Sequence, residues 1–411
     1  MKLRLQNVGK LADASIQIKG ITLIAGPNST GKSTIGKALF AMLNGFCVDD
    51  DFYDRTRRHA VRAALREAVL GNNRFFSEAH AQIDRMSEMV QAARQASGDW
   101  TELEAAFHRN FPNLPQAALD DLKQKLQSVQ RVTDEDLLKA RIHRQFSEEF
   151  SEQVGRIGCP DGSSIRLQIK DKTLAVDFHR DLEKTRVDQP FLLTNQAVYI
   201  DDPFVLNLSP RFPSDAPTDH RSHLLDLLTR APVHNLLEGM VAKEKLKNVF
   251  TSLDRACQGE LVFDQAGQSF RYKERASSEL VHSRNISAGL QTLLILHRLL
   301  SNRSIRENGT IILDEPEIHL HPAWQLVLAE CLVLLQKDYG LHILAASHSP
   351  YFIRAVEVHA YKHGLNARLN FYATSSSEEG FKLEDVTAGP NVIYKALSQP
   401  LQDLENVRYA N

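Results

Sequence analysis

The chain has 411 residues, 43% hydrophobic and 24% charged, which predicts a folded protein of about two to three domains. Its 49 Lys and Arg residues against 51 Asp and Glu give a net charge of −2, which excludes a strongly basic coat protein but not a local basic face. No run approaches the roughly 18 apolar residues of a membrane span, and the N-terminus lacks a signal-peptide core. The four cysteines lie far apart without a C-x-x-C pair, so we expect reduced thiols in a cytoplasmic protein.

Residues 1–48 predict a first lobe of strands followed by a helix. Leu3, Leu5 and Val8 alternate with polar residues, which is typical of a half-exposed antiparallel hairpin. Residues 21–25 form an unbroken apolar run, which is typical of a strand buried on both faces. A glycine-rich turn and then a helix over about 32–44 are expected to follow.

Residues 49–160 predict a mainly helical insertion. Apolar residues recur at three-four spacing over 83–93 and 119–129, and the segment between them holds two prolines that should break a helix. This pattern favours an antiparallel helical hairpin. Because each arm has only about two heptads, an ordinary helical subdomain is the plainer interpretation.

The rest of the chain predicts two further parts. Residues 161–280 contain two β-hairpins, a short apolar strand at 197–200, a proline-rich loop over 203–217 and helices. In residues 281–411 strands and helices alternate, which implies a parallel sheet with right-handed crossovers. The elements expected in this last part are helices at 287–301, 323–337 and 350–357, strands at 310–314, 341–346, 367–373 and 380–386, and a terminal helix.

A phosphate-binding loop is predicted between the buried strand and the first helix, where the sequence matches G-x-x-x-x-G-K-[ST]. Backbone N–H groups and the helix N-terminus supply partial positive charge to a polyphosphate, Lys32 adds a full charge, and the Ser33 hydroxyl can bind Mg²⁺. We therefore expect ATP and Mg²⁺ as cofactors, although a chance glycine turn would give the same letters. The expected nucleotide-binding residues are Gly26, Pro27, Asn28, Ser29, Thr30, Gly31, Lys32, Ser33 and Thr34.

Two carboxylates supply the second half of such a site. The apolar strand at 310–314 ends in Asp314, followed by Glu315, at the sheet edge where ligands bind in open α/β sheets. Asp314 is expected to hold Mg²⁺, directly or through water, and Glu315 to activate the attacking water. Many strands end in carboxylates without such a role, so this pair gains weight only beside the phosphate-binding loop.

Three segments resemble the ABC-type ATPases of the RecF, SMC and OLD group. Residues 314–322 resemble their D-E-P-E-x-x-L-H-P string, residues 345–350 their switch-histidine segment, and residues 285–291 their signature motif. The resemblance implies an α/β fold: an ABC-type P-loop ATPase head with a mixed sheet and an antiparallel N-terminal β-subdomain, here carrying the helical insertion.

The same resemblance implies that two heads close around two nucleotides, as a homodimer or a higher assembly. It assigns Ser287 and Gly289 to the γ-phosphate held by the other head, and His348 to sensing that phosphate. A plain helix N-cap and a core histidine are the simpler alternatives for Ser287 and His348. The signature reads Ser-Ala-Gly instead of Ser-Gly-Gly, and the usual glutamine has no clear match, with Gln196 as a candidate. Hydrolysis is therefore expected to be slow or partner-dependent.

The spacing of the motifs narrows the kind of ABC ATPase. About 250 residues between the P-loop and the signature speak against a transporter subunit, and long heptad arms of the SMC type are absent. No Toprim nuclease pattern follows His348. Residues 391–405 resemble the ending of small stand-alone prokaryotic antiphage ATPases of the Septu type. This implies a sensor or regulatory subunit that controls a separately encoded effector, such as a nuclease.

Two alternatives remain open. One is a DNA-repair ATPase of the RecF type, in which a basic stretch follows backbone phosphates; a solvated helix face is the plainer interpretation. The other is an RNA-cleaving toxin, because Arg354 and His359 have the R-x₄-H spacing of HEPN-type ribonucleases. The basic stretch consists of Arg55, Arg57, Arg58, Arg62 and Arg66.

Overall fold

The chain folds into two compact units. The first, which we call the head, combines Met1–Cys47 with Ile142–Asn411, and the second, the helical insertion, spans Val48–Arg141. None of the helices in the described part of the chain has both the length and the hydropathy needed to cross a membrane. The computed structural model describes residues 1–70, 83–90, 100–111, 114–159, 162–178, 186–188, 191–208, 219–231, 236–277 and 279–409.

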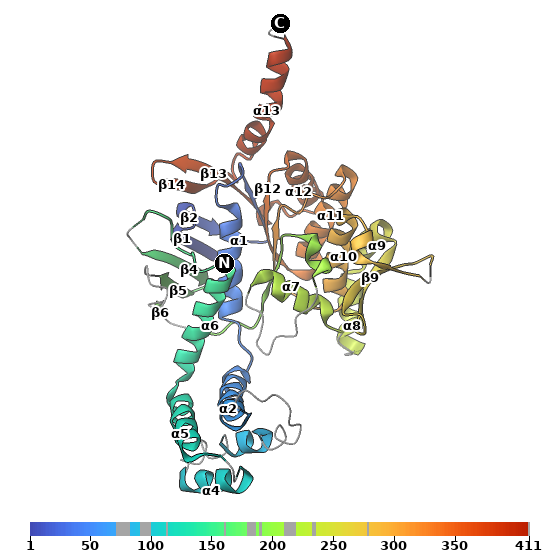
Figure 1. Ribbon diagram of the computed structural model, residues 1–411. Helices are drawn as coiled ribbons and strands as arrows, with labels where there is room; N and C mark the ends of the chain where they lie inside the picture. The colour runs from blue at the N-terminus through green and yellow to red at the C-terminus, as the bar shows by residue number, and fades with distance from the viewer. Residues whose placement is uncertain are drawn as a thin grey trace. The chain divides into compact units, whose positions relative to one another are not determined.

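The head is built on a large sheet with the strand order β6-β5-β4-β1-β2-β14-β13-β3-β12-β11-β7 (Figure 1). One side of the sheet is antiparallel and consists of β6, β5, β4, β1 and β2. On the other side, β7, β11, β12, β3 and β13 are parallel neighbours. The strands are β1 Lys2–Val8, β2 Leu11–Gln17, β3 Ile21–Ala25, β4 Ser163–Ile169, β5 Lys172–Phe178, β6 Arg186–Asp188, β7 Ala197–Ile200, β11 Thr310–Asp314, β12 His342–Ser347, β13 Leu369–Ser377 and β14 Gly380–Asp385.

Helices cover this sheet, and a small antiparallel sheet packs into the same core. The small sheet consists of β8 Gly259–Asp264, β9 Ser269–Glu274 and β10 Leu280–His282. The helices are α1 Lys32–Gly45, α6 Asp134–Glu149, α7 His220–Thr229, α8 Leu236–Lys245, α9 Lys247–Cys257, α10 Ala288–Ser301, α11 Pro322–Tyr339, α12 Pro350–Lys362 and α13 Asn391–Tyr409, with 3₁₀ turns η2 Pro203–Asn207, η3 Ser283–Asn285 and η4 Asn366–Arg368.

The predicted fold class is confirmed: an α/β head with a mixed sheet, an antiparallel N-terminal β-subdomain and a large helical insertion. Every residue of β3 is buried, as expected for a strand between two helical layers, whereas β1 alternates buried and exposed residues. The helix predicted at 350–357 continues to Lys362. It ends just before Gly364, whose left-handed backbone (φ 69°) stops a helix without steric cost.

The parallel strand order decides where the motifs lie. The phosphate-binding loop follows β3, the segment of the expected switch histidine follows β12, and the Asp-Glu pair ends β11, and these three strands are neighbours. Because the carboxyl ends of parallel strands meet at one edge of the sheet, all three motifs converge there.

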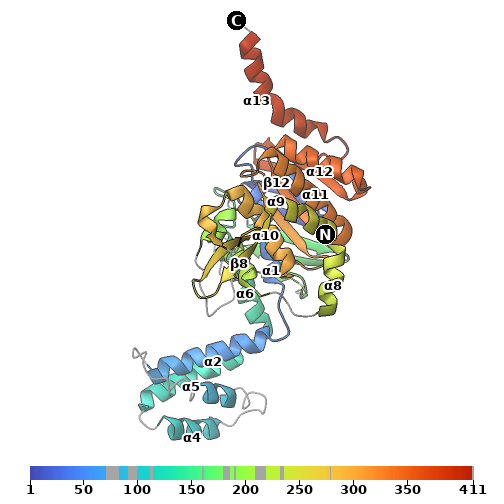
Figure 2. The ribbon, with the colours of Figure 1, turned by 90° about the vertical axis from the view of Figure 1, so that its right-hand side faces the viewer.

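The helical insertion has its own hydrophobic core. Both predicted apolar stripes enter this core, including Ile83 and Leu122, but side chains of α2 and α4 also complete it, so more than two arms share the core. Figure 2 shows the ribbons of α2, α4 and α5 within the insertion. Ala93, at the end of the first predicted stripe, lies outside the described residues. So does most of the proline-rich loop predicted at 203–217 of the head. The insertion contains α2 Phe52–Leu70, helical residues 83–90, α4 Trp100–Asn110, α5 Gln116–Arg131 and the start of α6.

Candidate nucleotide-binding site

The loop between β3 and α1 leaves the N-terminus of α1 open to an anion. Gly31 is the residue before the helix and has φ 94°, and a β-carbon there would lie 2.8 Å from Leu11 Cγ, so no other residue fits without strain. No side chain caps this helix end, and no acidic residue lies in its first turn. Its first N–H groups and its dipole are therefore available to bind a phosphate.

Lys32, the first residue of α1, is only 4% exposed and turns back into the loop. Its ammonium donates hydrogen bonds to the carbonyl oxygens of Gly26 at 2.9 Å and Pro27 at 2.7 Å. Burial lowers the pKa of Lys32, and the nearby carboxylates of Glu315 and Asp314 oppose that shift. An ammonium has three N–H groups, so one remains for a phosphate oxygen.

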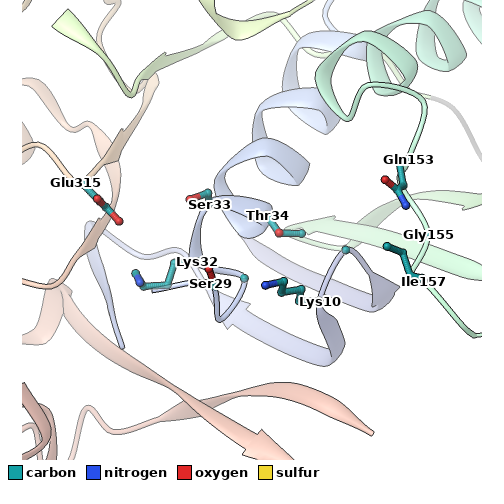
Figure 3. Close-up of a pocket in the computed structure, with 11 residues that line it drawn as sticks. Lys10, Ser29, Lys32, Ser33, Thr34, Gln153, Gly155, Ile157 and Glu315 are labelled. Carbon is teal, nitrogen blue, oxygen red and sulfur yellow. The ribbon is translucent and has the colours of Figure 1, made fainter. Parts of the chain in front are cut away.

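A pocket of about 360 Å³ opens beside this loop (Figure 3). Figure 3 shows Glu315 and Gln153 at opposite ends of it, with Lys32 and Lys10 between them. Of the expected nucleotide-binding residues, Gly26, Pro27, Asn28 and Thr30 do not line the pocket; Thr30 instead donates from its hydroxyl to the Pro27 carbonyl at 2.9 Å. The lining residues are Gly9, Lys10, Ser29, Gly31, Lys32, Ser33, Thr34, Gln153, Gly155, Ile157 and Glu315.

Asp314 lies at the end of β11, and one of its carboxylate oxygens is unpaired. Hydrogen bonds from the hydroxyls of Ser33 and Tyr199 reach its carboxylate, the second at 3.1 Å. Burial raises the pKa of Asp314, and these two hydrogen bonds oppose the shift. Its Oδ1 is buried without a hydrogen-bond partner, and a buried unpaired carboxylate oxygen next to a serine hydroxyl fits an oxygen-seeking cation.

Glu315 is held in an unusual backbone conformation. Its φ is 50°, in the left-handed region that costs a non-glycine residue of the order of 1 kcal/mol or more. The N–H of Glu315 donates to the carbonyl of Ala346 on β12 at 2.8 Å, which fixes this turn. The turned carboxylate lines the pocket and forms a hydrogen bond with Nε2 of His348, whose Nδ1 lies 3.2 Å from the Gly26 carbonyl oxygen.

Glu317 is a further residue of this site, to which the sequence reasoning gave no role. Its Oε1 accepts hydrogen bonds from the Ser347 hydroxyl at 2.5 Å and from the backbone N–H groups of His348 and Ser349, both at 3.0 Å. The carboxylate therefore ties the segment after β11 to the segment after β12. The signal was present, since Glu317 is the second glutamate of the D-E-P-E string.

Replacing Glu317 by Ala should lower the free energy of unfolding by about 2–4 kcal/mol, because three donors lose a charged acceptor inside the protein. ATP turnover should fall as well, since His348 loses the contact that holds its backbone. Urea denaturation and phosphate release measure the two effects. Glu384→Ala, at an exposed carboxylate of β14, is the control. A Glu317→Ala change no larger than that of the control would contradict the assigned role.

A buried polar network supports Asp314 from behind. The Tyr199 ring stacks on His220 with centroids 4.5 Å apart, and His220 pairs with Glu149 at 2.7 Å and Asp201 at 3.1 Å. Burial alone would lower the pKa of His220, but its two carboxylate partners raise it to about 9. The charged His220 ring therefore holds the Tyr199 ring in place. No pattern in the sequence indicated this network, because its residues are far apart in the chain.

The expected signature residues lie outside this pocket. Ser287 is exposed and caps α10, where its Oγ accepts from the N–H of Leu290 at 3.3 Å. Gly289 is buried, and a β-carbon there would lie 2.6 Å from the carbonyl oxygen of His319, so this glycine permits close packing. Gln196 does not line the pocket either; its Oε1 lies 3.1 Å from Nε2 of His223.

The structure corrects the predicted DNA contact at one arginine. Arg57 is 6% exposed and its guanidinium binds Asp134 and the Val132 carbonyl, so it cannot reach a phosphate from solvent. The expectation of a contact through Arg57 was wrong because α2 turns this side chain toward Val132 and Asp134 instead of toward solvent. Two other arginines pair with carboxylates, Arg55 with Asp49 and Arg62 with Asp84, whereas Arg58 and Arg66 are exposed.

The residues of the HEPN-like spacing have separate partners. Arg354 is exposed and donates to Glu357 at 2.7 Å, whereas Nδ1 of His359 lies 3.9 Å from Glu330 of α11. Because the two side chains face different carboxylates, only their spacing in the sequence favours a ribonuclease.

The fold and the site define a P-loop ATPase domain. Its loop between the parallel strand β3 and helix α1 carries a lysine, an aspartate and a glutamate follow at the end of β11, and the lysine and the glutamate line one pocket. The chain belongs to the family described as "AAA domain, putative AbiEii toxin, Type IV TA system", whose model matches residues 132–354. A second model, described as AAA domain, matches residues 2–154. A search of curated proteins found no significant match.

Solved structures that match this chain include two SMC heads and an ATP-binding cassette of an ABC transporter. The SMC head domain from Thermotoga maritima is 11% identical, with 94% of this chain and 98% of that chain covered and a TM-score of 0.40. An Smc head with an extended coiled coil, bound to the C-terminal domain of ScpA and derived from Pyrococcus furiosus, is 11% identical, with 99% and 98% covered and a TM-score of 0.43. An ATP-binding cassette of an ABC transporter in its ADP conformation is 12% identical, with 97% and 96% covered and a TM-score of 0.35.

Proposed function

We propose that the protein binds and hydrolyses ATP with Mg²⁺ and acts as the regulatory subunit of an antiphage or toxin-type complex, controlling a separate effector. The observation that carries the ATPase part is the convergence of Lys32, Asp314 and Glu315 on one sheet edge beside the pocket. The family description, which names a toxin of a toxin–antitoxin system, supports the second part.

Each residue of the site has a role in this proposal. The first N–H groups of α1 and the third N–H of Lys32 bind the phosphates. Ser33 and Asp314 hold Mg²⁺, which offsets negative charge on the phosphates when bound. Glu315 takes the proton of the attacking water, and His348 orients the Glu315 carboxylate through Nε2. Glu317 holds His348 in place through its backbone N–H.

A dimer is part of the proposal because Ser287 and Gly289 lie outside the pocket of their own chain. Ser287 is exposed at the N-terminus of α10, a position suited to a phosphate presented by a second head. The two heads would meet through the same surface of each, as in other twofold dimers.

A partner chain would need a surface to bind, and α13 supplies one candidate. This helix projects away from the rest of the head in both views (Figures 1 and 2). Four of its apolar residues, Val392, Leu401, Leu404 and Val407, are each more than half exposed. Apolar side chains gathered on one exposed element are typical of a protein interface.

Affinity purification of the full-length chain from its native cells tests the proposal. We expect a stoichiometric nuclease or other toxic enzyme to co-elute, and the α13 variant Leu401→Glu/Leu404→Glu to lose it. The matched control is Leu208→Glu/Leu280→Glu, which changes apolar residues with 50% and 46% exposure elsewhere on the head. Co-elution of replication or recombination proteins would favour the DNA-repair alternative.

The same preparation tests the two alternatives directly. A repair ATPase would bind DNA alone, with an affinity that falls steeply with salt and that drops when Arg58 and Arg66 become Glu. An RNA-cleaving toxin would degrade RNA without a partner, and Arg354→Ala would stop that cleavage. Either result would contradict the regulatory role.

A further inference from the structure

A cluster of two histidines and a glutamate joins α11 to α12, away from the nucleotide pocket. Glu330 lies on α11, His359 lies on α12 and His363 is the C-cap residue that directly follows α12. One ligand atom from each of these three residues lies within 4.8 Å of the other two, and this is the only such group of three or more among the described residues. None of the three lines the pocket beside the phosphate-binding loop.

Two imidazole nitrogens of this cluster are buried without a hydrogen-bond partner: Nδ1 of His359 and Nε2 of His363. Buried polar atoms in folded proteins are almost always paired, because leaving one unpaired costs about 1–3 kcal/mol. Nδ1 of His359 lies 3.9 Å from Oε1 of Glu330, too far for a hydrogen bond. Two unpaired lone-pair donors and a carboxylate facing one small space are what a metal ion uses.

The spacing of the histidines also fits. Residues four apart on a helix lie on one face, so His359 and His363 point to the same side of α12, where α11 presents Glu330. Two imidazoles and one carboxylate suit zinc and similar transition-metal ions, whereas magnesium and calcium prefer oxygen ligands alone. Metal–ligand distances of about 2 Å would require the ligand atoms to approach to roughly 3.3 Å, a small closure of side-chain torsions.

We propose that Glu330, His359 and His363 bind a divalent transition-metal ion, Zn²⁺ or an ion of the same ligand preference. Three protein ligands leave a fourth position for water or a further ligand. The ion would clamp α11, which follows the Asp-Glu pair, to α12, which follows the switch segment. This inference does not depend on the proposed ATPase function, since it rests on different residues.

Lys362 lies beside the proposed metal site and allows a second test of metal binding. Its ammonium lies 3.9 Å from Oε1 of Glu330 and its side chain is 64% exposed, so it competes with a metal for the same oxygen without being needed for folding. Removing that ammonium should tighten metal binding, a result that a purely structural role of the cluster does not produce.

The experiment is a Co²⁺ titration of the full-length, chelator-treated protein in the absence of Mg²⁺ and nucleotide. We expect one equivalent of Co²⁺ to give the intense visible d–d bands of a four-coordinate site, and Zn²⁺ to displace it. His363→Ala and Glu330→Gln should each weaken binding at least tenfold, since even changes beyond the direct ligands cost about 10–100-fold. Lys362→Gln should strengthen it. Zn²⁺ should raise the melting temperature of the unaltered chain and not that of His363→Ala.

His297→Ala is the matched control, because this histidine also faces a single carboxylate, Asp254 at 3.1 Å, but belongs to no such cluster. Its Co²⁺ affinity should equal that of the unaltered protein. Circular dichroism of every variant confirms folding, and Lys362→Gln and Glu330→Gln preserve side-chain size. The proposal is overturned if the bands are absent, if they indicate six-coordinate Co²⁺, or if all variants titrate alike.

Discussion

Glu315→Gln should bind ATP and fail to hydrolyse it. Glutamine keeps the size of the side chain but cannot accept a proton from water, so turnover at saturating ATP should fall by about 10²–10⁴-fold. The contacts proposed for the phosphates, from Lys32 and the α1 N-terminus, are unchanged, so the dissociation constant for ATP should stay within a few-fold. Phosphate release and binding of a fluorescent ATP analogue give the two numbers.

The control for this experiment is Glu307→Gln, which neutralises a carboxylate on the surface that pairs with Lys245. It should hydrolyse ATP at the unaltered rate. Full turnover in Glu315→Gln would exclude Glu315 as the base. Loss of ATP binding would instead mean that the carboxylate supports the pocket, which it lines together with Ser33 and Lys32.

Mixing Lys32→Ala with Ser287→Arg chains should restore activity that neither variant has alone. Lys32→Ala removes the charge that faces the phosphates, and Ser287→Arg puts a bulky side chain at the exposed start of α10. In a mixed dimer one of two sites combines an intact loop with an intact signature. If chains pair at random, half of the dimers are mixed, so about a quarter of full activity should return.

The matched control replaces the second partner by the double variant Lys32→Ala/Ser287→Arg. This mixture contains no site with an intact loop and should stay inactive. Because Ser287 also caps α10, its loss costs about 1 kcal/mol, and melting curves must show that the Arg variant is folded. The dimer proposal fails if the first mixture stays inactive, or if specific activity is unchanged when the unaltered protein is diluted far below micromolar concentration.

Much of the site was visible in the sequence because its motifs are local. A glycine-rich loop with Lys32 after an apolar strand and Asp314-Glu315 at the end of another are strings of adjacent residues, each with its own chemistry. The strand at 310–314 was predicted with its observed bounds, and the helix that begins after Ser287 was placed correctly. Alternation at β1 and an unbroken apolar run at β3 also distinguished a strand with one buried face from a strand buried on both faces.

Other features arise only when distant segments meet. His220 and Glu149 lie 71 residues apart and support Tyr199 and Asp314, which are separated by 115. The burial of Arg57 depends on which face of α2 meets residues 132–134, and the pattern of five arginines within 55–66 cannot show that.

The sequence by itself determined the class of fold and the positions of the glycine-rich loop and of the strand-end carboxylates, since periodicity and short motifs record local conformation. Only the tertiary structure decided which charges are satisfied and by which partner: Glu317 with the switch segment, His220 between two carboxylates, and Glu330 opposite two histidines. The physical reason is that burial and pairing are properties of the space between elements, and no single segment contains that space.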